Sequence, residues 1–134
     1  LYIAYRRELS EGSEFVHMSF RERYHIREKA VVDAIENWKL LTEEAYKALI
    51  NGHKEKSGPL MNKNFDLRKS VMNISDTNIQ MVETARKTGA SAKFTGSGGA
   101  IIGTFPDNSS LAELKVRLGE IGVNVIIPEI VNKE

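Results

Sequence analysis

The stretch Lys93–Ala100, which reads KFTGSGGA, decides the fold of this chain. A short apolar start leads into three glycines and two hydroxyl side chains, and the apolar pair Ile101 and Ile102 follows directly. This pattern predicts a strand, a tight glycine turn and a second strand. Glycine reaches positive φ without a steric penalty and has no Cβ, so the backbone of such a turn can approach a ligand closely.

The glycine turn has two interpretations. Successive backbone N–H groups in such a turn form a concave surface that favours anions such as phosphate. The alternative is a β-hairpin turn that binds nothing. The chain contains no Gly-x-x-x-x-Gly-Lys-Ser/Thr motif, which excludes a Walker loop, and Ile101 stands where a dinucleotide-binding fingerprint needs its third glycine. The turn alone therefore does not decide between the two interpretations.

Composition restricts the class of protein. At 134 residues, 41% of them hydrophobic and 28% charged, the chain has the size and composition of one soluble globular domain. It contains no cysteine, which excludes disulfides and thiolate metal sites and fits a cytoplasmic location. The net charge is +1, and Glu22 and Glu28 interrupt the basic cluster at Arg21–Lys29, so we expect no nucleic-acid partner. No apolar stretch approaches the roughly 20 residues that span a bilayer, so no membrane partner is expected.

Hydrophobic periodicity and turn residues divide the chain into strands and helices. Apolar residues at three- and four-residue spacing from Val16 to Leu49 indicate one long amphipathic helix, or two consecutive ones, ending at Gly52. The other expected strands are 1–5, 91–95, 100–105 and 123–127. A helix is expected at 60–71, and the next one is capped by Ser75 or Asp76, or by a Thr77–Gln80 capping box, and ends at Gly89. A last helix runs from a Ser110–Glu113 capping box to 121. Apart from the helices inserted after the first strand, the order is β-α-β-β-α-β. It predicts an α+β, ferredoxin-like fold, with an antiparallel sheet covered on one face by helices.

The sequence around the glycine turn carries a family resemblance. The run Met81–Lys93 leads into the turn, and Asn62–Arg68 lies upstream of it. Together they resemble the C-terminal domain of the GHMP kinases, which phosphorylate small molecules such as galactose, homoserine and mevalonate. The strand Leu1–Tyr5, Val16-His17 and the segment Arg21–Tyr24 resemble the glucuronokinase-like branch of sugar-1-kinases. Many family members have a longer glycine run than the one found here.

The resemblance implies a function for a larger protein. Such a protein would transfer the γ-phosphoryl group of ATP to a sugar hydroxyl, with Mg²⁺ bridging the phosphates. ATP, Mg²⁺ and the catalytic aspartate would be held mainly by an N-terminal kinase domain, a partner of residues 1–134. Leu1 is not methionine and begins directly in a strand pattern, so we expect a fragment of a longer chain that is inactive in isolation. The alternative is a non-catalytic ferredoxin-like ligand-binding or regulatory module, because this fold hosts many functions.

The resemblance also implies an active-site loop. The segment made of Thr95, Gly96, Ser97, Gly98 and Gly99 would buttress the phosphate loop of the missing domain and face the acceptor. Its catalytic partners are unknown from these residues. Three scattered histidines and the absence of ligand-like spacing predict no metal site within the chain.

Four further residues are candidates for binding a sugar or sugar acid. Arg21 and Arg23 carry guanidinium forks that suit a carboxylate, and the alternative is an exposed helix face. The resemblance suggests that Asn64 and Asp66 bind sugar hydroxyls, whereas Asp66 could instead be a local cap or ion-pair partner. If this segment is helical, Asn64 and Arg68 share a face and Asp66 points elsewhere.

Lys93 immediately precedes the loop. It could reach a phosphate, but strand alternation could equally point its side chain to solvent.

Overall fold

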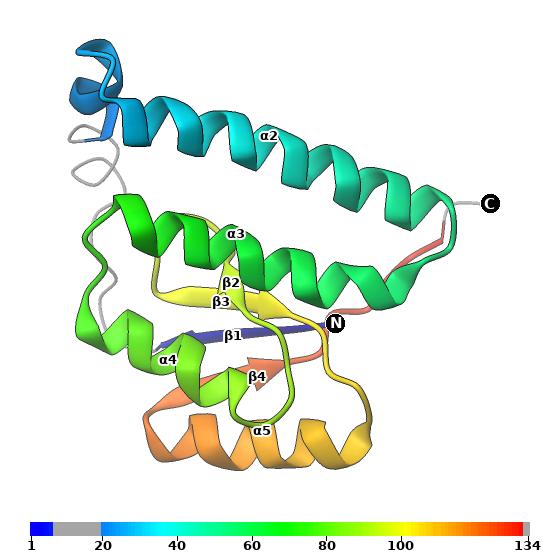
Figure 1. Ribbon diagram of the computed structural model, residues 1–134. Coiled ribbons are helices and arrows are strands. Elements are labelled where there is room, and N and C mark those ends of the chain that lie inside the picture. The colour runs from blue at the N-terminus through cyan, green and yellow to red at the C-terminus, as the bar shows by residue number, and fades with distance from the viewer. Residues whose placement is uncertain (7–19, 133–134) are drawn as a thin grey trace.

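A four-stranded antiparallel sheet forms the centre of the structure, a computed structural model that describes residues 1–6 and 20–132. The strands are β1 (Tyr2–Arg6), β2 (Lys93–Phe94), β3 (Ala100–Gly103) and β4 (Val123–Ile126), in the spatial order β2-β3-β1-β4. β1 pairs with both β3 and β4, so the N-terminal strand lies inside the sheet (Figure 1). The predicted α+β arrangement, β-α-β-β-α-β, is confirmed.

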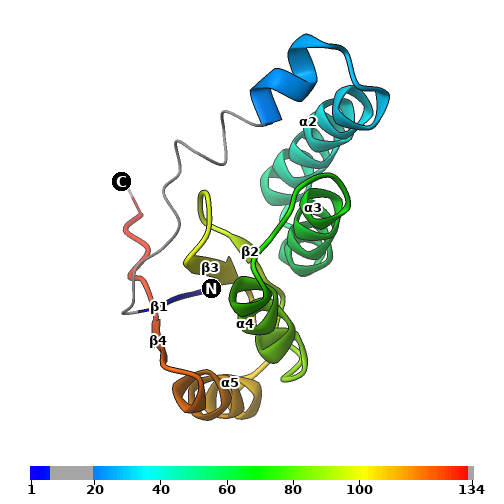
Figure 2. The same ribbon diagram turned by 90° about the vertical axis from the view of Figure 1, so that its left-hand side faces the viewer.

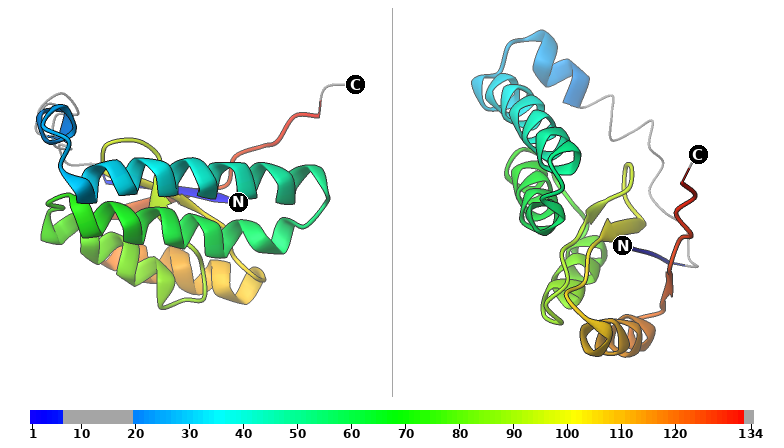
Figure 3. Two further views of the ribbon diagram at one scale, coloured as in Figure 1. Left: turned by 45° about the horizontal axis from the view of Figure 1, so that its top comes forward. Right: turned by 90° about the vertical axis from the view of Figure 1, so that its right-hand side faces the viewer.

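The helices form two layers. α4 (Asp76–Arg86) and α5 (Asn108–Glu120) cover one face of the sheet, and α2 (Lys29–Ile50) and α3 (Ser57–Val71) are inserted between β1 and α4 (Figure 2). α3 lies beside the edge strand β2, and α2 packs along α3 (Figure 3). The inserted pair therefore adds a wall next to the sheet edge from which the glycine turn emerges. Across residues 1–6 and 20–132, no helix combines the length and apolar character needed to cross a membrane.

Side-chain capping explains where two helices begin. The Ser75 hydroxyl accepts a hydrogen bond from the Asn78 N–H at 3.4 Å, so Ser75 caps α4, as one of the sequence alternatives has it. The predicted Ser110–Glu113 capping box is wrong. Asp107 caps α5 instead, because its carboxylate, three residues before Ser110, accepts a hydrogen bond from the Ser110 N–H at 2.7 Å. Ser110 is buried in the first turn, and its hydroxyl donates to the Thr88 carbonyl at 2.6 Å.

Several element boundaries differ from the sequence prediction. Of the two alternatives for the first helical region, the structure has two consecutive helices, because the chain turns at residues 26–28 and Arg27 adopts a φ of 58°. α3 begins at Ser57 rather than Leu60, and Pro59 lies in its first turn, where a missing N–H breaks no helical bond. Val16 lies outside the described residues.

The strand β2 is shorter than predicted for a specific reason. The Ala92 N–H donates to the Asn62 side chain of α3 at 2.9 Å, so it does not join the ladder. The Ser91 N–H still reaches the Thr104 carbonyl at 2.9 Å. Contact with α3 therefore replaces part of the strand pairing that the apolar pattern indicates.

The core lies between the sheet and the helices. Tyr2 and Ala4 alternate toward the helical side of β1, and Ile101 lies opposite Ala4 on β3. Phe65 of α3 belongs to the same buried cluster, so the inserted helix is part of one core with the sheet. The Tyr2 hydroxyl donates to the Ser91 carbonyl at 2.6 Å, and burial raises the pKa of this phenol far above its ordinary value.

We expect Gly103→Ala to destabilise the domain strongly. A Cβ at Gly103 would lie 1.8 Å from the Ser91 carbonyl oxygen and 2.9 Å from the Tyr2 ring, so the backbone itself would have to move. Overpacking of this kind costs about 1–3 kcal/mol or more. Gly119→Ala is the control, because α5 leaves open space there, and alanine in a helix gains roughly 0.5–1 kcal/mol over glycine. Urea unfolding of the two variants checks the contrast, and equal stabilities would contradict it.

Candidate functional site

The glycine loop at residues 95–99 connects β2 to β3 and has a defined backbone conformation. Gly98 has a φ of 143° and Gly99 a φ of 78°, a region that side-chain-bearing residues rarely adopt. The Thr95 N–H donates to the Ala100 carbonyl at 3.2 Å and closes the turn. The Arg6 N–H donates to the Gly99 carbonyl at 3.0 Å, which ties the loop to the end of β1.

Two helices hold the loop through side chains. Arg68 of α3 donates from Nη1 to the Gly96 carbonyl at 2.5 Å, and its guanidinium lies 5.3 Å from the centre of the Phe94 ring. Asn78 of α4, almost fully buried, accepts from the Gly99 N–H at 3.2 Å. The loop is therefore fixed from both sides by residues that lie far from it in the sequence.

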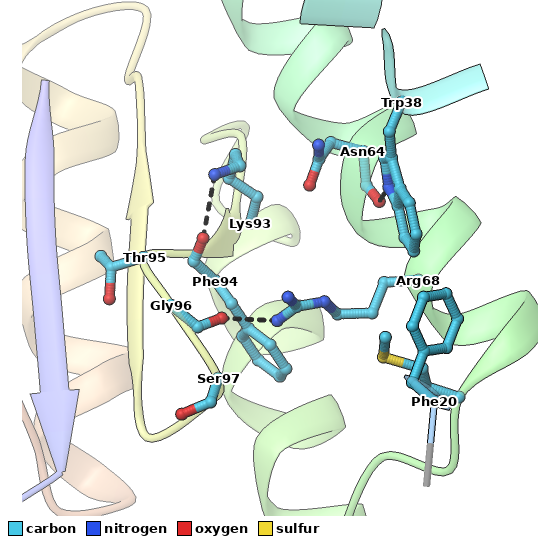
Figure 4. Close-up of a pocket in the computed structure, with 10 residues that line it drawn as sticks. Phe20, Trp38, Asn64, Arg68, Lys93, Phe94, Thr95, Gly96 and Ser97 are labelled. Atoms are coloured by element: carbon cyan, nitrogen blue, oxygen red, sulfur yellow. Dashed lines mark hydrogen bonds between the residues drawn. The ribbon is translucent and has the colours of Figure 1, made fainter. Parts of the chain in front are cut away.

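A pocket of about 620 Å³ opens between this loop, α3 and α2 (Figure 4). Trp38 of α2 forms one wall, and its indole N–H donates to the Asn64 carbonyl of α3 at 3.3 Å. The Phe20 ring packs edge-on against Trp38 with 5.8 Å between the ring centres. Aromatic walls with a few polar side chains are typical of small-molecule sites. The lining residues are Phe20, Trp38, Asn64, Arg68, Met72, Lys93, Phe94, Thr95, Gly96 and Ser97.

The charged side chains of this pocket are cationic. Burial lowers the pKa of Arg68, and burial together with the nearby Arg68 charge lowers the pKa of Lys93. The Lys93 ammonium donates to the Phe94 carbonyl at 3.0 Å. Within residues 1–6 and 20–132, neither side chain forms an ion pair with a carboxylate. The pocket therefore presents uncompensated positive charge, which favours an anionic group.

The structure brings some of the predicted site residues together and separates others. Gly96, Thr95 and Ser97 line the pocket, but the Thr95 and Ser97 side chains point away from Arg68 (Figure 4). Asn64 lies in the pocket on the same face of α3 as Arg68, which is the expected helical relation. Asp66 points elsewhere and pairs with Arg86 at 2.7 Å.

The two predicted arginines lie outside this lining. Arg23 binds both carboxylate oxygens of Glu28 at 2.8 Å and also donates to the Val71 carbonyl, so its fork is engaged locally. That ion pair raises the pKa of Arg23 and lowers the pKa of Glu28. Arg21 is exposed. A substrate role for Arg21 and Arg23 stays a prediction.

The sequence indicated no binding role for Arg68 or Trp38 and left the role of Lys93 open, yet all three line the pocket. Arg68 was detectable from its four-residue spacing to Asn64, and Lys93 from its position before the loop. In the sequence, Trp38 shows only the apolar spacing of a helix face. Its approach to Asn64 depends on how α2 packs against α3, which this spacing does not indicate.

The residues described do not fit a complete Mg²⁺–ATP site. The Gly99 N–H is already bound to Asn78 and the Thr95 N–H to Ala100, so two loop donors are unavailable to a phosphate. No group of three or more histidine, aspartate or glutamate side chains in the part of the chain that the structure describes could hold a metal ion.

Comparison with solved structures first defines the class of fold. L. major mevalonate kinase in complex with R-mevalonate superposes with a TM-score of 0.82 at 18% identity, over 97% of this chain and 43% of that one. At this identity the likeness concerns the fold alone.

Sequence comparison then defines the family. The model of the family described as GHMP kinases C terminal matches residues 45–124. Two curated relatives from Arabidopsis thaliana, probable glucuronokinase 2 and glucuronokinase 1, are 37% and 35% identical over 117 residues, which is 85% of this chain and 32% of each relative. The chain belongs to the GHMP kinase C-terminal family, and it spans about a third of the length of these relatives.

The loop geometry predicts that alanine lowers the stability of the domain at one glycine of the loop and leaves it nearly unchanged at another. Gly98→Ala places a Cβ 3.0 Å from the Asn78 amide at a φ of 143°, and such backbone strain costs about 1–3 kcal/mol. Gly96→Ala meets nothing within 4 Å and should change stability by less than about 0.5 kcal/mol. Urea unfolding, with NMR of the Asn78 and Gly99 amides, distinguishes them. Two variants with the same stability and the same loop signals would contradict this account of the loop.

Proposed function

We propose that this chain forms the acceptor-side half of an ATP-dependent sugar kinase of the glucuronokinase type. The observation that carries the proposal is the cationic, aromatic-walled pocket beside the glycine loop, in a chain that resembles two glucuronokinases over most of its length. Such a pocket suits a sugar that bears a negative charge. The proposal extends the family assignment to a substrate class and a reaction.

The reaction would need a second domain. Phosphoryl transfer requires a nucleotide cradle, Mg²⁺ and a group that positions or deprotonates the acceptor hydroxyl. In the proposal, ATP and Mg²⁺ supply the phosphoryl group and its charge neutralisation, held mainly by an N-terminal kinase domain. This chain spans only 32% of its relatives' length, which leaves room for that domain in a protein of their size. The absence of cysteine fits the cytoplasmic location that we also propose.

The residues of this chain would position the acceptor. Backbone atoms of the loop at 95–99 would face the sugar and support the phosphate loop of the other domain. The Asn64 amide, with both donors and an acceptor, suits sugar hydroxyls. The Arg23–Glu28 and Asp66–Arg86 ion pairs favour structural roles for Arg23 and Asp66. Arg21 is exposed, and a substrate contact by its guanidinium stays part of the proposal.

Kinase assays of the full-length protein and of this chain alone test the proposal. We expect the full-length protein to phosphorylate glucuronate with ATP and Mg²⁺, and the 134-residue chain to show no measurable turnover. Turnover by the isolated chain would refute the half-site assignment. Sugar binding without phosphoryl transfer by the full-length protein would favour a ligand-binding or regulatory module instead.

The loop should matter for catalysis in the full-length enzyme. Gly98→Val would displace the loop from Asn78, and a misplacement near 1 Å is enough to lower kcat by about 100-fold. Gly119→Ala on α5, in open space, is the control and should keep normal activity. Circular dichroism verifies that both variants are folded. A folded Gly98→Val enzyme with normal turnover would show that the loop has only a structural role.

A further inference from the structure

We propose that Arg68 and Lys93 together recognise the anionic group of the acceptor, so that they set the preference for a sugar acid over its neutral counterpart. This inference rests on the proposed kinase function and assigns its specificity to two named residues. They approach the pocket from different elements, Arg68 from α3 and Lys93 from β2, and both line the same cavity (Figure 4).

The first support is the contrast with other arginines of the chain. Arg23, Arg86 and Arg117 each pair with a carboxylate at 2.7–2.8 Å. In the described part of the chain Arg68 has no such partner, although burial lowers its pKa. Partly buried cations without a counter-charge lower stability, and a bound anion would offset this cost.

The second support is that Arg68 is held in place by a contact that uses only one of its N–H donors. One N–H group of its guanidinium binds the Gly96 carbonyl, and the guanidinium carbon lies over the Phe94 ring. A guanidinium has five N–H donors, so this contact leaves others for a ligand. A preorganised fork loses little entropy when it binds a carboxylate, and charge-assisted bonds of this kind are about twice as strong as neutral ones.

The third support is the position of Lys93. Its ammonium uses one of three donors on the Phe94 carbonyl, and the neighbouring Arg68 charge contributes to lowering its pKa. Two cations that line one cavity favour an anion bound in it. Trp38 and Phe20 supply an apolar wall in the same pocket, against which a sugar ring could lie.

The two cations should differ in their effect on turnover. Arg68 also fixes the loop through Gly96, so anion binding and loop position are coupled at this residue. The hydrogen bond of the Lys93 side chain within the described residues goes to its own strand neighbour, Phe94, and does not hold the loop. Removal of the Lys93 charge should therefore raise KM alone, whereas removal of the Arg68 fork should raise KM and lower kcat together.

Steady-state kinetics of the full-length enzyme with glucuronate and with glucose test the assignment, because these sugars differ only in a carboxylate against a hydroxymethyl group. We expect Lys93→Met and Arg68→Lys to raise KM for glucuronate about 10- to 100-fold, as the loss of charge-assisted bonds does, and to leave KM for glucose unchanged. Lys93→Arg should restore much of the affinity. Lys69→Met is the matched control, because Lys69 lies on α3 outside the pocket, 3.8 Å from Glu83.

The pH dependence gives a second readout. Because the pKa of Lys93 lies below its ordinary value, the ammonium loses its proton at a lower pH than an exposed lysine would. KM for glucuronate should rise as pH increases through that pKa, and Lys93→Met should abolish the dependence. The other charged side chain in the described lining of this pocket is Arg68, which stays protonated throughout.

The outcomes separate the two proposals. A wild-type enzyme that phosphorylates neither sugar refutes the kinase function itself. An enzyme that prefers glucose refutes the role of Arg68 and Lys93 while the kinase assignment stands. Variants that raise KM for both sugars equally, or that raise KM for glucuronate no more than Lys69→Met does, refute that role as well.

Discussion

The hydrogen bond from Arg68 to the Gly96 carbonyl connects the parts of this structure that matter for function. It joins α3, an inserted helix, to the loop between the two strands at the sheet edge. The bond from Gly99 to Asn78 completes the attachment from α4. Phe65 of α3 is buried in the core, so these two hydrogen bonds fix the position of the loop and of the pocket relative to the core.

Charge in this domain is distributed in two ways. At Arg23 and Arg86 each guanidinium binds a carboxylate and at least one backbone carbonyl, which neutralises its charge and fixes local structure. At Arg68 and Lys93 the chain instead leaves positive charge half buried beside a cavity. Such an arrangement lowers the stability of the empty domain, and it is the kind of compromise found where a protein binds a ligand.

Much of the fold was predictable because its signals are local. Strand alternation, apolar helix faces and the left-handed glycine at Gly89 lie within a few residues of the structure that they determine, and the β-α-β-β-α-β order follows from them. The errors arose where distant groups compete for the same backbone. The Ala92 N–H leaves the ladder for Asn62 of α3, and the hydroxyl of Ser110, the expected helix cap, donates to the Thr88 carbonyl instead.

The sequence by itself determined the fold class, the glycine loop, the family resemblance and the shared face of Asn64 and Arg68, since each follows from short-range periodicity or from motif spacing. Only the tertiary structure decided which cations line the pocket. Arg23 pairs with Glu28 and with the carbonyl of Val71, which lies 48 residues away, whereas Lys93 lines the pocket with its ammonium on the Phe94 carbonyl. Pairing between charged side chains depends on contacts between elements that are distant in the chain, and no local pattern encodes that choice.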